Sequence, residues 1–136
     1  MIAFALLAAA TIEGTPLGVL ERQALPAKGC AAYLFTADGT RRFVAMAGAE
    51  DGRLRLVVDG ATLDAARADQ TGASGYGFAA TTKYRAVGVT ATLDLTTESR
   101  GDLTAGATVP QATLRIDREE KDGIAVPLVG LIGCAT

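Results

Sequence analysis

The sequence predicts an all-β domain of about eight antiparallel strands, forming either a small closed barrel or a two-sheet sandwich. The dipeptide Asp-Gly occurs four times in the chain, and it favours tight hairpin turns because both residues tolerate positive φ. Between these turns apolar and polar residues alternate, as they do in strands with one buried face. After the N-terminal apolar run, no segment sustains a helical period over about 11 residues. A chain of 136 residues has room for one such domain.

The first ten residues, MIAFALLAAA, form an uninterrupted apolar run. A transmembrane helix needs about 20 residues, so this run is too short, and its closing alanines suit signal-peptide cleavage. We therefore expect a signal peptide over residues 1–10, an N-terminal extension over 11–27 and a single β domain over 28–136. The protein would then be periplasmic or secreted, with no transmembrane span. Because a positively charged start is missing, the alternative is that residues 1–10 form the first buried strand or helix of the domain.

Two cysteines, Cys30 and Cys134, bracket nearly all of the remaining chain. In an oxidising compartment they would form a disulfide that closes a loop of about 105 residues. The bond would tie the first strand of the domain to the last, which favours a barrel over a sandwich. The alternative is two unrelated buried thiols.

Residues 30–66 are expected to form a four-stranded meander that opens the domain. Two-residue turns at the first three Asp-Gly pairs place one set of apolar residues, together with Cys30, on a single face. The predicted cross-strand pairs are Leu34–Phe43, Ala32–Ala45, Ala47–Leu56, Ala45–Val58, Val58–Ala61 and Leu56–Leu63. On the opposite face Arg55 lies across from Asp64, in line with Gly48. This exposed ion pair contributes at most about 1 kcal/mol to the free energy of unfolding.

Alternation resumes after a polar connection and predicts two further strands. One covers residues 76–84, and the other covers 87–97; a long turn is expected over 98–110. The residues expected to share the buried face of the second of these strands are Val87, Val89, Ala91, Leu93 and Leu95.

A final hairpin is predicted around Asp122-Gly123, where a two-residue turn pairs Ile116 with Val129 and Leu114 with Leu131. This register leaves a conflict, because the opposite face of the last strand is apolar as well. The residues on that face are Ile124, Val126, Leu128, Ile132 and Cys134. Either the last strand is buried on both sides, or the register is off by one residue.

The composition excludes several kinds of chemistry. The chain has no histidine, so catalytic triads based on histidine and imidazole metal sites are impossible. Two cysteines without histidine cannot complete a zinc site. A net charge of −2 with mixed signs gives no footprint for nucleic acid. The stretch GASGYG (residues 72–77) only approximates a nucleophile elbow and lacks the required base. We therefore expect no cofactor, no metal and no recognisable catalytic constellation.

Aromatic residues carry the strongest remaining signal. In an extended strand Tyr76, Phe78 and Tyr84 share one face, which is either part of the core or the lining of a ligand site. Tyr33 and Phe35 lie on the face of the first hairpin opposite its core. Arg42 is expected opposite Phe35, where it could anchor a carboxylate or stack on a ring. The candidate ligand-binding residues are Tyr76, Phe78, Tyr84, Tyr33, Phe35 and Arg42.

The sequence therefore favours an exported, non-enzymatic β domain that binds a small apolar or aromatic ligand. The alternative is a protein-interaction module of the cell envelope, such as an inhibitor or an assembly subunit, with Tyr33 and Phe35 on its contact surface. A third hypothesis is an enzyme that works through carboxylates and tyrosine. Its first candidates are Asp64, Asp94 and Glu98, although their spacing does not bring any two of them together.

Overall fold

The computed structural model describes residues 15–99 and 106–135, and this part of the chain is all β. The expected signal peptide therefore lies outside the described residues. Within them no helix is long and apolar enough to span a membrane. The strands are β1 (Leu17–Gly18), β2 (Cys30–Thr36), β3 (Phe43–Gly48), β4 (Arg53–Val58), β5 (Ala61–Thr71), β6 (Thr81–Ala86), β7 (Val89–Glu98), β8 (Gly106–Arg118) and β9 (Ile124–Cys134).

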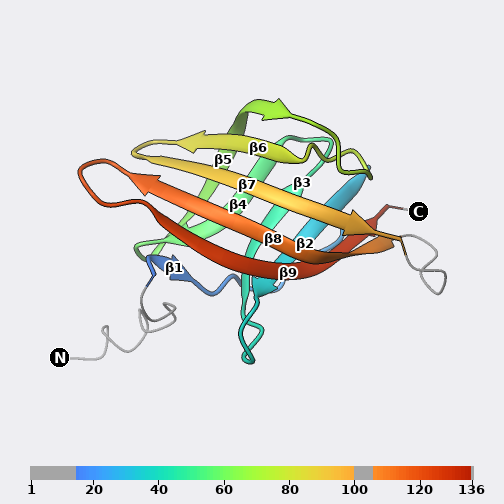
Figure 1. Cartoon of the computed structure of the whole chain (residues 1–136), viewed down its shortest axis with the longest axis horizontal. Helices are drawn as coiled ribbons and strands as arrows, with labels where there is room; N and C mark the ends of the chain where they lie inside the picture. Colours follow the sequence, from blue (N-terminus) through green and yellow to red (C-terminus); the bar gives the residue numbers. More distant parts are fainter. Residues whose placement is uncertain (1–14, 100–105, 136) are drawn as a thin grey trace.

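Eight of these strands form a closed antiparallel barrel. From β2 to β9 each strand pairs with the next one in the sequence, and β9 pairs with β2 to close the sheet. Figure 1 shows β7, β8 and β9 crossing the near wall, with β2, β3 and β4 behind them. The short β1 pairs with the last two residues of β4, beyond the point where β3 stops pairing with it. The predicted all-β fold is confirmed, and it is a barrel.

The barrel interior is filled by alternate side chains from every wall strand. An eight-stranded barrel is just wide enough inside for side chains to fill it. The largest fully buried side chains of these strands are Leu34, Val44, Leu54, Leu56, Tyr84, Leu93, Val109, Leu114, Ile116 and Leu128. Burial of such side chains stabilises the fold by about 1.5–3 kcal/mol each.

The turn at Asp59-Gly60 has the predicted geometry. Both residues have positive φ, 50° and 84°, as a tight two-residue hairpin requires. The register that follows places Val58 opposite Ala61 and Leu56 opposite Leu63, which confirms the prediction for this hairpin.

The first two hairpins have longer loops than predicted. Leu34 lies opposite Ala45, and Ala47 lies opposite Leu54, so each pairing is shifted by two residues. In the β2–β3 loop the carboxylate of Asp38 accepts hydrogen bonds from the hydroxyl groups of Thr40 (2.6 Å) and Thr36 (2.9 Å). These bonds stabilise a wider turn than Asp-Gly alone would make.

A shift of two residues keeps the inner face intact, with one exception. A bulge between β2 and β3 leaves Phe43 opposite Phe35, which is on the outer face. The prediction that Phe43 joins the buried face is therefore wrong, and so is the prediction that Arg42 lies opposite Phe35. Met46, and not Gly48, lies opposite Arg55.

The last hairpin has a different register from the one predicted. Its turn covers residues 119–123, and Ile116 lies opposite Ile124, five residues away from the predicted partner. An odd shift exchanges the two faces of a strand. The predicted register was therefore wrong, by five residues and not by one, and the faces are exchanged: Val126 and Leu128 point into the core, while Leu131 is on the outside and is 52% exposed.

The starts of three other strands differ from prediction. β6 begins at Thr81 because residues 72–80 form an irregular turn, in which Gly75 and Tyr76 have positive φ (116° and 58°). Val87 lies in the β6–β7 turn and is 99% exposed, whereas Val89 begins β7. β8 begins at Gly106, within the range expected to be a turn.

The disulfide closes the barrel at its seam. Cys30 of β2 and Cys134 of β9 lie directly opposite each other, with their Cα atoms 3.9 Å apart. The prediction that the bond ties the first wall strand to the last is confirmed.

Candidate binding site

Residues 15–27, which we call the strap, lie across the outside of the barrel wall. β1 fixes the start of the strap to β4. The backbone N–H of Leu20 then donates a hydrogen bond to the carbonyl oxygen of Phe43 at 2.9 Å. The side chains of Leu17 and Leu20 are buried, so the strap packs against the wall as part of the domain.

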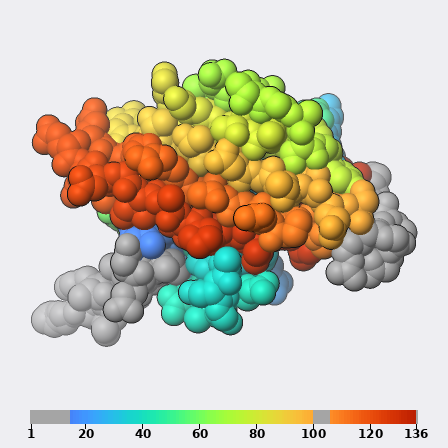
Figure 2. Space-filling view, in the orientation of Figure 1, coloured from blue at the N-terminus to red at the C-terminus, as the bar shows by residue number. Residues whose placement is uncertain are grey.

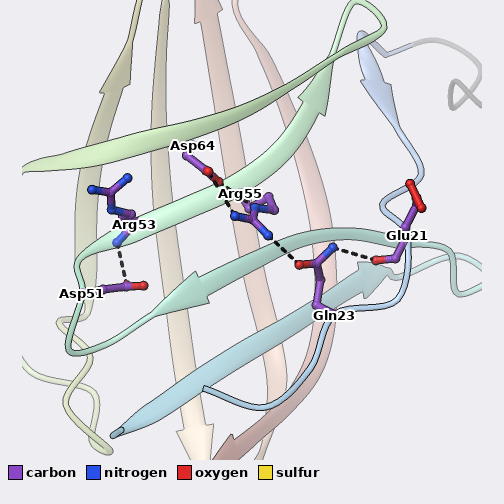
Figure 3. Close-up of polar contacts among 6 residues, drawn as sticks. All are labelled: Glu21, Gln23, Asp51, Arg53, Arg55 and Asp64. Atoms are coloured by element: carbon purple, nitrogen blue, oxygen red, sulfur yellow. Dashed lines mark hydrogen bonds and ion pairs between the residues drawn. The ribbon is translucent and has the colours of Figure 1, made fainter. Parts of the chain in front are cut away.

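A polar network holds the middle of the strap. The guanidinium of Arg55 donates to Gln23 Oε1 at 2.7 Å and forms two hydrogen bonds with the carboxylate of Asp64, at 2.7 and 3.1 Å (Figure 3). Gln23 in turn donates from Nε2 to the carbonyl oxygen of Glu21. The hydrogen bonds from Arg55 hold the pKa of Asp64 below its ordinary value. The predicted Arg55–Asp64 pair is confirmed, and it also anchors the strap through Gln23.

An open apolar groove lies between the strap and the wall. We call it the strap groove; its volume is about 540 Å³, within the range of small-molecule sites. Its lining comes from the strap, from β2 and β3, and from β9. The lining residues are Leu20, Arg22, Gln23, Leu25, Tyr33, Phe35, Phe43, Leu131, Ile132 and Gly133.

Three aromatic rings form the floor of the strap groove. The ring centroids of Phe35 and Phe43 are 5.3 Å apart, and those of Tyr33 and Phe43 are 6.1 Å apart, both in tilted arrangements. The hydroxyl of Tyr33 donates to the carbonyl oxygen of Ala24 in the strap at 3.0 Å. Partial burial raises the pKa of Tyr33. All three rings are only partly buried, so they present apolar surface to the groove.

A second groove follows on the same outer surface. We call it the wall groove; it has a volume of about 500 Å³ and shares Phe35 and Leu131 with the strap groove. The β2–β3 loop, which projects from the barrel in teal in Figure 2, contributes Arg41. The remaining lining residues are Thr108, Val109, Pro110, Val129 and Gly130. The exposed side chain of Leu131 therefore belongs to both grooves.

The candidate residues predicted from the sequence fall into separate places. Tyr33 and Phe35 meet in the strap groove. Phe78 and Tyr84 are buried in the core, where desolvation raises the pKa of Tyr84. Tyr76 is partly buried in the turn after β5, and its hydroxyl is hydrogen-bonded to that of Ser99.

The stretch that contains Tyr76 and Phe78 covers one end of the barrel. The hydroxyl of Ser74 donates to the carbonyl oxygen of Leu95 at 3.0 Å, and the hydroxyl of Thr97 donates to the carbonyl oxygen of Ser74. The side chain of Phe78 packs against the core. These contacts explain the glycine-rich sequence as a structural turn. A role for Tyr76, Phe78 or Tyr84 in binding stays a prediction.

Arg42 lies at the end of the β2–β3 loop. Its backbone N–H donates to the hydroxyl of Thr36 at 3.0 Å, and its carbonyl oxygen accepts from the Thr36 N–H at 2.9 Å. The residue is exposed, and it lines neither groove. A role in anchoring a ligand stays a prediction for this residue too.

The three carboxylates considered for catalysis lie on different parts of the barrel. Asp64 of β5 is engaged by Arg55, and Asp94 of β7 accepts a hydrogen bond from Thr81 at 2.5 Å. Glu98 follows Asp94 four residues along the same strand, a distance of about 13 Å. Over the described ranges no three Cys, Asp or Glu side chains are grouped closely enough to hold a metal ion.

Several groove residues were not predicted. Phe43 and Leu131 were assigned to the wrong face because the register depends on loop lengths that the sequence does not reveal. Leu25, Arg22 and Arg41 lie in the strap and in a loop, where no periodic pattern assigns a direction to a side chain. One signal was available: the last strand is apolar on both faces, which indicates that one apolar set lies outside the core.

Comparisons with known proteins add no information on the fold or on the site. A scan against protein-family models found no match, and searches of curated proteins and of solved structures also found none.

Proposed function

We propose that this protein is an exported, non-enzymatic binding domain that holds a small apolar or aromatic ligand on the outside of its barrel. The observation that carries the proposal is the strap groove, with its floor of three partly exposed rings. Contiguous apolar patches on a protein surface often mark a binding site. The barrel interior is filled by side chains, so an outer site is favoured over a site inside it.

The disulfide supports the exported location. Disulfides form and persist in oxidising compartments such as the periplasm or the extracellular space. The bond between Cys30 and Cys134 joins β2 to β9, the two strands that close the barrel. It would add most stability in such a compartment, because no cytosolic reductant opposes it there.

A direct test uses the uncharged fluorescent probe N-phenyl-1-naphthylamine, whose emission rises in apolar sites. We expect the protein to bind it at micromolar concentrations. Leu131→Asp places a charge on the edge shared by the two grooves and is expected to weaken binding at least tenfold. The matched control is Val87→Asp, since Val87 is equally apolar, is 99% exposed and lies in the turn between β6 and β7. Equal binding by wild type and Leu131→Asp would refute a ligand site in these grooves.

The second candidate function is a protein-interaction module of the cell envelope. It is favoured by the exposure of Leu25 (61%) next to Leu131 (52%), which extends the apolar surface beyond the groove floor. Native mass spectrometry of protein purified from its own host separates the two. A retained small molecule that Leu131→Asp releases supports the ligand-binding function. A stoichiometric protein partner lost in the same variant supports the interaction module.

A further inference from the structure

The polar groups of the strap groove are almost all committed to the fold. Gln23 uses Oε1 to accept from Arg55 and Nε2 to donate to the Glu21 carbonyl. The hydroxyl of Tyr33 donates to the Ala24 carbonyl oxygen. Among the side chains that line this groove, this leaves Arg22 as the only polar one without a partner in the described part of the chain.

The wall groove repeats this arrangement. The hydroxyl of Thr108 donates to the carbonyl oxygen of Glu98 at 3.2 Å. Arg41 is the other polar lining residue, and its side chain has no hydrogen bond or ion pair to any described residue. Asp38, in the same loop, binds Thr36 and Thr40 through its carboxylate and does not pair with the Arg41 side chain.

The charges in the two grooves therefore have one sign. As far as the described residues go, each groove combines an apolar body with one guanidinium that has no partner among them, and no acidic residue among them lines either groove. A guanidinium binds a carboxylate or sulfonate through two parallel hydrogen bonds, and an apolar surface beside it takes the rest of the molecule. A site of one sign also raises the local concentration of ligands of the opposite charge.

We propose that the ligand of this site is an anionic amphiphile: a free small molecule with an apolar chain or ring system and one acidic head group. The apolar part lies against Phe35, Phe43 and Leu131, and the head group binds Arg22 or Arg41. This inference rests on the proposed function and specifies the chemistry of its ligand. The volume of each groove, about 500 Å³, fits one small molecule better than it fits a membrane surface.

Two probes with the same ring skeleton test the inference. 8-Anilino-1-naphthalenesulfonate carries an acidic group, and N-phenyl-1-naphthylamine lacks it. We expect wild-type protein to bind the sulfonate more tightly, and we expect 0.5 M NaCl to reduce this preference because the arginines are exposed. The double variant Arg22→Gln/Arg41→Gln should raise the Kd of the sulfonate about tenfold and leave the Kd of the neutral probe within about twofold. The single variants show which arginine binds the head group.

The matched control is Arg85→Gln. Arg85 is an exposed arginine of β6, which lies across the barrel from β2, so this variant makes the same type of substitution away from both grooves. It should leave both Kd values unchanged. The substituted arginines form no side-chain hydrogen bond or ion pair with any residue in 15–99 or 106–135, so thermal unfolding of each variant should match wild type.

The outcomes distinguish a failure of the proposed function from a failure of this inference. Failure of both probes to bind would overturn the proposed function and this inference with it. Binding of both probes with equal affinity would overturn the inference alone, and so would an unchanged Kd for the sulfonate in the double variant. An equal loss of sulfonate binding in Arg85→Gln would assign the effect to net charge, which also contradicts a specific head-group site.

Discussion

Removing the disulfide tests how the barrel is held closed. The bond joins residues 104 positions apart, directly across the β2–β9 seam. In the chain-entropy model, closing a loop of about 105 residues lowers the entropy of the unfolded chain and stabilises the fold by about 4.7 kcal/mol at 25 °C. Single-domain proteins have free energies of unfolding of about 5–15 kcal/mol, so this bond is a large part of the total.

The experiment compares wild type with the double variant Cys30→Ala/Cys134→Ala in urea. We expect the free energy of unfolding to fall by about 3–5 kcal/mol, and the melting temperature to fall by about 10–20 °C. The urea m-value should rise, because the unfolded chain without the cross-link exposes more surface.

Two results would contradict this reasoning. A loss below about 1 kcal/mol would mean that the unfolded chain gains little freedom when the bond is removed. A loss of the stated size with an unchanged m-value would place the effect in the folded seam. As a check, reduction of the wild-type protein should give the same free energy as the double variant.

Three further predictions concern the barrel wall. Leu54→Ala leaves a cavity at a fully buried site and should lower the free energy of unfolding by about 2–5 kcal/mol, measured in urea. Gly130→Ala should destabilise the seam, because the new Cβ would lie 2.1 Å from a backbone oxygen of β2; Gly39→Ala, with open space around it, is the control, and equal melting temperatures for the two variants would contradict the prediction. The pKa of Asp64 is lowered in the folded state, so its pair with Arg55 stabilises the protein above about pH 4 and loses this effect as the pH falls through the lower folded pKa. Arg55→Gln should therefore cost at most about 1 kcal/mol at pH 7 and less as the pH falls through the folded pKa of Asp64, and an NMR titration of Asp64 checks the direction of the shift.

The strap gives the strap groove its shape. Without residues 20–25 the aromatic floor would be an open apolar surface; with them it is a groove with a second wall. The strap is held by backbone pairing at β1 and by Arg55 through Gln23, so the groove depends on contacts between distant parts of the chain.

The outer site could be predicted only in part from the sequence. Tyr33 and Phe35 were expected on the outer face, because they alternate with Leu34 in a strand whose other face is apolar. Their partner Phe43 was expected in the core, and a bulge of one residue moved it outside. Bulges and loop lengths depend on hydrogen bonds such as those of Asp38, which the dipeptide Asp-Gly does not reveal.

By itself, the sequence determined the all-β class and the tight turn at Asp59-Gly60, and it left Cys30 and Cys134 as the only possible pair of cysteines, because alternation, turn chemistry and cysteine number are local or counted properties. Tertiary structure alone decided the closure between β9 and β2, the face occupied by Leu131 and the path of the strap. Each of these follows from contacts between distant residues, and a register error of an odd number exchanges the inside and the outside of a strand. The grooves belong to this second group, since their lining comes from the strap, β2, β3, β8, β9 and one loop at once.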